Sequence, residues 1–260
     1  MTTAPVAELR ITVLLGGGEA APLLRALVPL VEGRDAEIKG LFIEDDELLR
    51  LAALPVSQEL CRLTLSERAL DPATLEQQFR IQARLARRAL ETAVGLERAR
   101  RSVRSARGTL ATLLPREAEG VDLLVFGPAG ATPRFGRTPA PRRAAEREPG
   151  PVVVVCSGSP AGLRALTIAE RLARARRQRL EVLVIAADDD KARALAVDLR
   201  AKLQPPPSRC RALPRPDTET LVQTARGAAA LVIEALPELL QGLGLRVLQQ
   251  GLACPVLLVR

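Results

Sequence analysis

Two groups of glycines are the parts of this sequence that could form a binding site. Gly16-Gly17-Gly18 follows a β-rich run at residues 9–15, and Gly127 begins a second group after a run at 123–126. Backbone N–H groups beside glycine can approach phosphate oxygens, and the start of a following helix adds a favourable dipole. Glycine is also needed wherever a strand turns tightly into a helix. Both interpretations are open from these residues alone.

A basic segment at residues 98–107, RARRSVRSAR, is the other candidate for chemistry. Five arginines in ten residues could contact phosphates or an acidic protein. The segment also fits the third strand of a sheet, kept soluble at the sheet edge by its charges. The whole chain carries a net charge of +8, but only three of its 38 basic residues are lysines. Such a preference for arginine over lysine resembles a drift in the composition of the whole genome. We therefore favour a solvated basic surface over nucleic-acid binding.

Several classes of chemistry are excluded by composition. The chain has no His, Trp or Tyr, which removes serine–histidine catalysis, histidine-ligated zinc and most aromatic platforms for single-stranded nucleic acid. The four cysteines are far apart, without metal-ligand spacing, as expected of free thiols in a reducing cytosol. No run of about 18 apolar residues or secretion signal is present. We therefore expect a cytoplasmic protein with no catalytic residue, no metal and no membrane contact.

An internal repeat organises the predicted elements. Strand-like runs at 9–15 and 38–43 flank a helical stretch, and runs at 151–155 and 180–185 flank another. The run at 123–126 corresponds to the one at 231–234. Repeat one carries a predicted helical insertion at about 45–98, in which Asp71-Pro72 begins a helix that places Leu75, Phe79, Ala86, Leu90 and Val94 on one face.

Continuous apolar strands that alternate with helices indicate a parallel sheet covered on both faces. The predicted fold class is α/β, with two doubly wound, Rossmann-like repeats packed as a pseudo-dimer. We place repeat one at 1–148 and repeat two at 149–260. The run at 151–155 could be the last strand of repeat one or the first of repeat two.

Several landmarks in this order resemble the universal stress protein family, whose fold is of the adenine nucleotide alpha hydrolase type. The segment VCSGSPAGLRAL at 155–166 resembles the family's opening strand and loop, and VLLGGGEAA at 13–21 does so more loosely. VDLLVFG at 121–127 resembles the strand before its phosphate loop, and ACPVLLVR at 253–260 its closing strand. The resemblance covers nearly the whole chain and implies a bacterial-type protein of the stress response.

The resemblance also implies where a nucleotide would bind. The family's phosphate loop is Gly, two residues, Gly, nine residues, then Gly with Ser or Thr; in repeat one the last gap is only five residues. The family's Asp after the first strand corresponds to Gly16 here and to Ser157 in repeat two, and Glu234 replaces the loop glycine of repeat two. The candidate cofactor-binding residues in repeat one are Gly16, Gly17, Gly18, Gly127, Gly130, Arg134, Gly136, Arg137 and Thr138.

These departures predict a stress or regulatory protein that is not an enzyme and acts as a binding scaffold, with a degenerate nucleotide site and no required cofactor. Its protein partners are not identified by the sequence, and a homodimer is one option. The first alternative is an ATP- or AMP-binding switch, or a slow ATPase, that uses repeat one. The second is a basic protein associated with nucleic acid.

Overall fold

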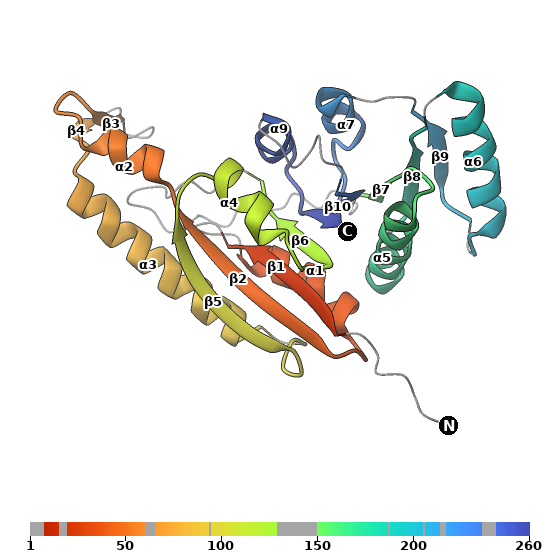
Figure 1. The fold of residues 1–260 in the computed structure, drawn as a ribbon, viewed down its shortest axis with the longest axis horizontal. Coiled ribbons are helices and arrows are strands. Elements are labelled where there is room, and N and C mark those ends of the chain that lie inside the picture. The colour runs from red at the N-terminus through yellow and green to blue at the C-terminus, as the bar shows by residue number, and fades with distance from the viewer. Residues whose placement is uncertain are drawn as a thin grey trace.

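The computed structural model describes residues 8–15, 20–60, 66–93, 95–128, 150–186, 188–204, 206–213, 217–235 and 243–260. Strands and helices alternate along most of the chain (Figure 1). The first half contains β1 (Leu9–Leu14), α1 (Ala20–Val31), β2 (Ala36–Glu44), α2 (Asp46–Ala52), β3 (Gln58–Leu60), β4 (Glu67–Ala69), α3 (Pro72–Glu91), β5 (Arg100–Arg107), α4 (Leu110–Glu117) and β6 (Leu123–Phe126). The second half contains β7 (Val152–Cys156), α5 (Pro160–Arg176), β8 (Leu180–Val184), α6 (Asp189–Lys202), β9 (Arg209–Ala212), α7 (Thr218–Thr224), β10 (Ala230–Glu234), α9 (Leu243–Gly251) and β11 (Val256–Val259).

The main sheet has nine strands in the order β5-β2-β1-β6-β11-β10-β7-β8-β9. Every neighbouring pair is parallel except β6 and β11, which are antiparallel. The mostly parallel α/β fold predicted from the apolar strands is confirmed. Strand β7 pairs with β10 on one side and with β8 on the other, so residues 152–156 belong to the second half of the sheet.

The two halves meet edge to edge at the antiparallel pair. Leu124 of β6 lies opposite Leu258 of β11, and Phe126 lies opposite Val256. The backbone N–H of Arg260 donates a hydrogen bond to the Asp122 carbonyl at 3.1 Å, which extends the junction by one residue. Because the strands of each half are parallel among themselves, the two halves run in opposite directions across one continuous sheet.

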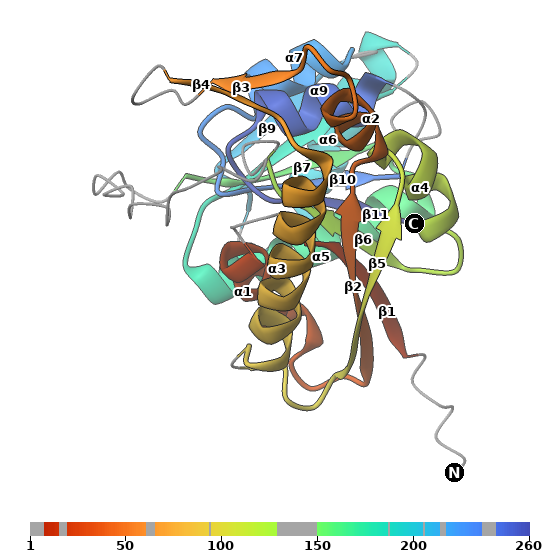
Figure 2. The ribbon, with the colours of Figure 1, turned by 90° about the vertical axis from the view of Figure 1, so that its left-hand side faces the viewer.

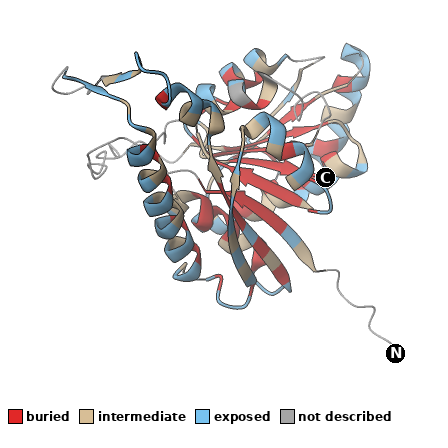
Figure 3. Cartoon of the chain, turned by 60° about the vertical axis from the view of Figure 1, so that its left-hand side comes forward, coloured by how far each residue is buried: buried red, intermediate tan, exposed pale blue. Residues whose placement is uncertain are grey.

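Alternating strand residues divide the core into two clusters, one on each face of the sheet. Ile11 and Val13 of β1 pack in the cluster that α1, α3, α5 and α6 cover, while Leu14 packs in the cluster beneath α4, α7 and α9. Strand β7 alternates likewise, and all five of its residues are buried. Figure 3 shows the buried residues concentrated along the strands and on the inward sides of the helices. Helices on both faces explain why the central strands β6, β7, β10 and β11 are buried along their whole length.

The segment between β2 and β5 is partly helical, as predicted, but it also holds the antiparallel hairpin of β3 and β4. Helix α3 begins at the predicted position, where the Asp71 side chain accepts a 2.8 Å hydrogen bond from the Thr74 N–H. Leu75, Phe79, Ala86 and Leu90 form its buried face, and Phe79 contacts Phe42 edge to face, with ring centroids 6.3 Å apart. Val94 lies outside the described residues.

Among the helices that the structure describes, none combines the length and the apolar character that crossing a bilayer requires. The predicted boundary at 148 and 149 falls outside the described residues, so it stays a prediction.

Candidate functional site

The sheet has two places where a ligand of an α/β protein would be expected. Ligands of such sheets bind outside the carboxyl ends of the strands, between two neighbouring strands whose following connections run toward opposite sides of the sheet. In the first half this crevice lies between β1 and β6, and in the second between β7 and β10. Since β6 and β11 are antiparallel, the carboxyl ends of the two halves lie on opposite edges of the sheet. The two candidate crevices are therefore separate.

The structure describes few of the residues expected to form the first crevice. Gly127 follows β6 directly and is half-buried. A methyl group on Gly127 would come within 3.4 Å of the Leu23 side chain on α1, which is ordinary contact. The other predicted residues, Gly16, Gly17, Gly18, Gly130, Arg134, Gly136, Arg137 and Thr138, lie outside the described residues. The predicted phosphate cradle of repeat one therefore stays a prediction.

The second crevice is described at the start of α5. Ser159 is the N-cap of this helix: its hydroxyl oxygen accepts a 2.9 Å hydrogen bond from the Gly162 N–H. The Ser157 hydroxyl oxygen in turn accepts a bond from the Ser159 N–H at 3.2 Å. Gly158, between the two serines, has a φ of 78°, a conformation that favours glycine. The local sequence thus turns β7 into α5 and satisfies the first N–H groups of the helix with side-chain hydroxyls.

Glu234, the last residue of β10, lies against this helix start. Among the described residues it is the only buried charged side chain, with 3% of its surface exposed. Its Oε2 accepts a hydrogen bond from the Ser159 hydroxyl. Its Oε1 is buried and has no hydrogen-bond partner within the described residues. The protein therefore places a carboxylate of its own at the positive end of the α5 dipole.

Gly162 leaves room for that carboxylate. A methyl group at this position would lie 3.0 Å from Oε2 of Glu234 and 3.0 Å from the backbone nitrogen of Ser157. Both distances are shorter than ordinary van der Waals contact. The sequence predicted Glu234 in place of the loop glycine of repeat two, but Gly162 and Ser159 were not predicted as its neighbours. The adjacent Cys156 thiol has a raised pKa, mainly because it is buried.

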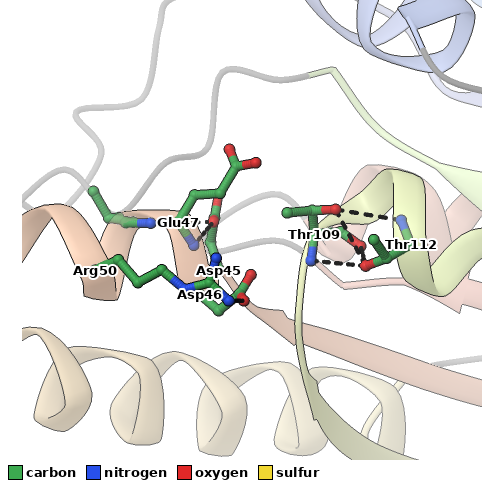
Figure 4. A network of polar contacts seen from close by, with 7 residues as sticks. Asp45, Asp46, Glu47, Arg50, Thr109 and Thr112 are labelled. Carbon is green, nitrogen blue, oxygen red and sulfur yellow. Dashed lines mark hydrogen bonds and ion pairs between the residues drawn. The ribbon is translucent and has the colours of Figure 1, made fainter.

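Other helix starts are also occupied by side chains of this chain. The Asp45 carboxylate accepts bonds from the Glu47 and Leu48 N–H groups at the start of α2, and Thr109 forms a capping box with Thr112 at the start of α4 (Figure 4). Asp188 and Asp217 cap α6 and α7. The pKa of Asp188 is lowered mainly by the bond from the Lys191 backbone, and that of Asp217 mainly by its side-chain bond with Thr220. These helix starts are not free to bind an external anion.

The basic segment forms β5, the edge strand predicted from its pattern, and it pairs in parallel with β2. Most of its guanidinium groups face carboxylates. Arg100 pairs with Glu8, Arg104 with Glu117, and Arg107 with Glu44 and Glu76 at 3.5 and 3.3 Å. The bond with Glu8 is the main cause of a raised Arg100 pKa. These charges are largely compensated within the protein.

The acidic and cysteine side chains that the structure describes form no group of three or more that could hold a metal ion. Cys156 and Cys254 are buried and Cys210 is half-buried, all as free thiols. Burial raises the pKa of Cys210 and raises that of Cys254 to about 11. Thiols with raised pKa values are poor nucleophiles, which fits a structural role in the core.

Comparison with solved structures shows which fold this is. The structure resembles that of a universal stress protein from Archaeoglobus fulgidus, with a TM-score of 0.50 and 11% identity over 96% of each chain. A protein of unknown function from Pseudomonas aeruginosa matches with a TM-score of 0.46 and 13% identity over 97% of this chain and 92% of that one. At 11% identity, the match to the Archaeoglobus fulgidus protein establishes the fold and nothing further. This is the fold that the sequence resemblance predicted. No family model matches the sequence, and no curated protein matches it significantly.

Proposed function

We propose that this chain is a stress-response or regulatory protein of the universal stress protein type, built as a tandem repeat, that acts in the cytoplasm as a scaffold for protein contacts. It works without a bound nucleotide and catalyses no reaction. The likeness in fold to a universal stress protein supports the class of protein. The buried carboxylate in the second crevice supports a degenerate nucleotide site. A protein of this fold that binds no nucleotide would act through contacts with other proteins, which supports the scaffold role.

The observation that carries the degenerate site is the buried carboxylate of Glu234 at the start of α5. An N–H group or hydroxyl that already donates to a carboxylate is not available to a phosphate. A phosphate bound within about 4 Å of this carboxylate would also be repelled, by roughly 1 kcal/mol in water and about 4 kcal/mol near a protein surface. The carboxylate therefore lowers the affinity of this crevice for nucleotide phosphates.

The proposal is tested by titrating the purified full chain with ATP and with AMP in a calorimeter. We expect no binding tighter than a Kd of about 1 mM, which corresponds to about 4 kcal/mol. A micromolar Kd would refute the degenerate site. If that binding were lost in Gly127→Val, the protein would be a nucleotide-dependent switch that uses its first half.

A variant tests the role of the Glu234 charge directly. Glu234→Gln keeps the size of the side chain and removes the charge, so residual phosphate binding should become tighter. The matched control is Asp188→Asn, which removes a carboxylate from a different helix start, where Asn can still act as a cap. Equal ATP affinity in wild type, Glu234→Gln and Asp188→Asn would show that the Glu234 charge is not the barrier.

A further inference from the structure

Helix α3 carries an exposed stripe of arginines that form no salt bridge with any residue the structure describes. The helix lies along the outside of the sheet, beside β5 (Figure 2). Its buried face packs against the sheet, and its opposite face is in solvent (Figure 3). We use the name α3 stripe for the exposed residues Arg80, Ile81, Arg84, Leu85 and Arg88. Each of them is three or four residues from a member one helical turn away, so they share one side of the helix.

The arginines of the stripe differ from those of β5. Within the described part of the chain, none of Arg80, Arg84 and Arg88 forms a salt bridge. Arg80 and Arg84 donate only long bonds to backbone carbonyls of α3, at 3.4 and 3.3 Å. Residues 77–90 include four arginines and no Asp or Glu. Like charges four residues apart destabilise a helix by about 0.2–0.5 kcal/mol per pair, a cost that an acidic partner would relieve.

Two aliphatic side chains lie beside these charges. Ile81 is 36% exposed and Leu85 is 53% exposed, one helical turn apart. Phosphate contacts do not need exposed aliphatic groups, and the stripe has no aromatic residue on which a base could stack. A membrane-binding helix would turn its main apolar face outward, whereas α3 buries Leu75, Phe79, Ala86 and Leu90 against the sheet. A small apolar contact flanked by charge is the pattern of helix-to-helix docking.

From these observations we infer that the α3 stripe is a docking surface for an acidic amphipathic helix of a partner protein. Leucine-like side chains of the partner pack against Ile81 and Leu85, and its carboxylates pair with Arg80, Arg84 and Arg88. A second copy of this chain would not bind here by its own α3 stripe, because two basic stripes would face and repel each other. The inference rests on the proposed scaffold function and identifies the kind of partner that it takes.

The probe is a fluorescein-labelled peptide of about three heptads, with leucine at the apolar positions and glutamate beside them. Its binding to the full chain is followed by fluorescence anisotropy at about 50 mM and about 300 mM NaCl. We expect saturable binding that weakens at the higher salt but is not abolished, because part of the contact is apolar. A scrambled peptide of the same composition should bind at least about tenfold more weakly.

Arg80→Glu/Arg84→Glu/Arg88→Glu should weaken the binding by about tenfold or more. The matched control, Arg34→Glu/Arg98→Glu/Arg226→Glu, makes the same change in net charge at three exposed arginines elsewhere and should bind like wild type. Ile81→Gln/Leu85→Gln should also weaken the binding. Circular dichroism confirms folding, and Arg84→Glu alone serves if the triple variant does not fold.

Unchanged binding by the arginine variant, or equal binding of the scrambled peptide, would overturn the inference. Tighter binding of duplex DNA or of phosphatidylserine vesicles than of the peptide would overturn it in favour of those partners. If neither the peptide nor ATP binds, the docking surface is refuted and the degenerate nucleotide site is retained. Micromolar ATP binding would refute the degenerate site whatever the peptide does.

Discussion

Ser159 donates a hydrogen bond from its hydroxyl to Oε2 of Glu234, a residue 75 positions further along the chain. The same hydroxyl oxygen accepts a bond from the Gly162 N–H, so one side chain links the first turn of α5 to the end of β10. The second Glu234 oxygen has no partner within the described residues. This connection stabilises a buried charge at the crevice between β7 and β10, and it can be tested by mutation.

Ser159→Ala should lower the free energy of unfolding by about 2–4 kcal/mol, because it removes a helix cap and leaves both oxygens of a buried carboxylate without a donor. Ser159→Ala/Glu234→Ala should cost less than the sum of the single variants, since the unpaired charge is gone. Urea unfolding measures each value. Thr109→Ala, which removes a hydroxyl cap with no buried carboxylate beside it, should cost only about 1 kcal/mol. Equal losses in Ser159→Ala and Thr109→Ala would contradict the role of Glu234.

Gly162→Ala tests the space that the carboxylate occupies. The added methyl group would meet Oε2 of Glu234 and the Ser157 nitrogen, each at 3.0 Å. We expect a net loss of about 1–2 kcal/mol, although alanine is the better helix former. In a Glu234→Ala background the loss should shrink, because one of the two contacts is absent. The same loss in both backgrounds, measured by urea unfolding, would show that Glu234 does not limit this position.

Arg101 should contribute to stability through the end of α3. Its guanidinium group donates to the carbonyls of Leu90 and Glu91 at 3.1 and 2.7 Å. Arg101→Ala leaves these carbonyls without that donor and should cost about 1–2 kcal/mol. The melting temperature would fall by roughly 2–4 °C per kcal/mol in a protein of this size. Arg98→Ala is the control, since Arg98 is exposed. An equal fall of the melting temperature in both variants would show that Arg101 does not stabilise the end of α3.

The buried thiol of Cys254 should make stability depend on pH in alkaline solution. Burial raises its pKa from an ordinary value of 9.0 to about 11 in the folded state. Below pH 9 both states keep the proton and the contribution is fully present; between pH 9 and 11 the unfolded state alone loses it, so stability falls as pH rises. The loss from this residue is on the order of 2–3 kcal/mol.

The measurement is urea unfolding at several pH values from 8 to 11, in wild type and in Cys254→Ala. The variant should lose less stability across this range than wild type does. Cys156, whose pKa burial also raises, should give a residual slope of the same sign in the variant. Identical slopes in the two proteins would mean that Cys254 does not titrate as its burial requires.

The sequence predicted the elements of the sheet well because their signals are local. Strand β7 contains a run of four valines, and α3 begins at an Asp-Pro pair, so each could be recognised without its neighbours. The β3 and β4 hairpin was missed because its strands are three residues long, and Glu67–Ala69 is exposed throughout. A short strand without a buried face shows no alternation of apolar residues.

The site was harder to predict because it depends on contacts between distant residues. Glu234 was recognised as an unusual residue at the end of its strand, but its direction toward Ser159 is set by the packing of β10 beside β7. The α3 stripe was missed for a similar reason. The sequence pointed to the arginines of residues 98–107, and only the fold shows that carboxylates pair with Arg100, Arg104 and Arg107. Within the described residues, Arg80, Arg84 and Arg88 of α3 form no salt bridge.

The antiparallel pair of β6 and β11 has a consequence for how the protein is made. During translation β6 emerges from the ribosome well before β11, so one edge of the N-terminal half stays open while the rest is synthesised. An exposed apolar edge of this kind can pair with the wrong chain. Until β11 is synthesised and pairs with β6, the nascent polypeptide therefore exposes an edge at which such mispairing can occur.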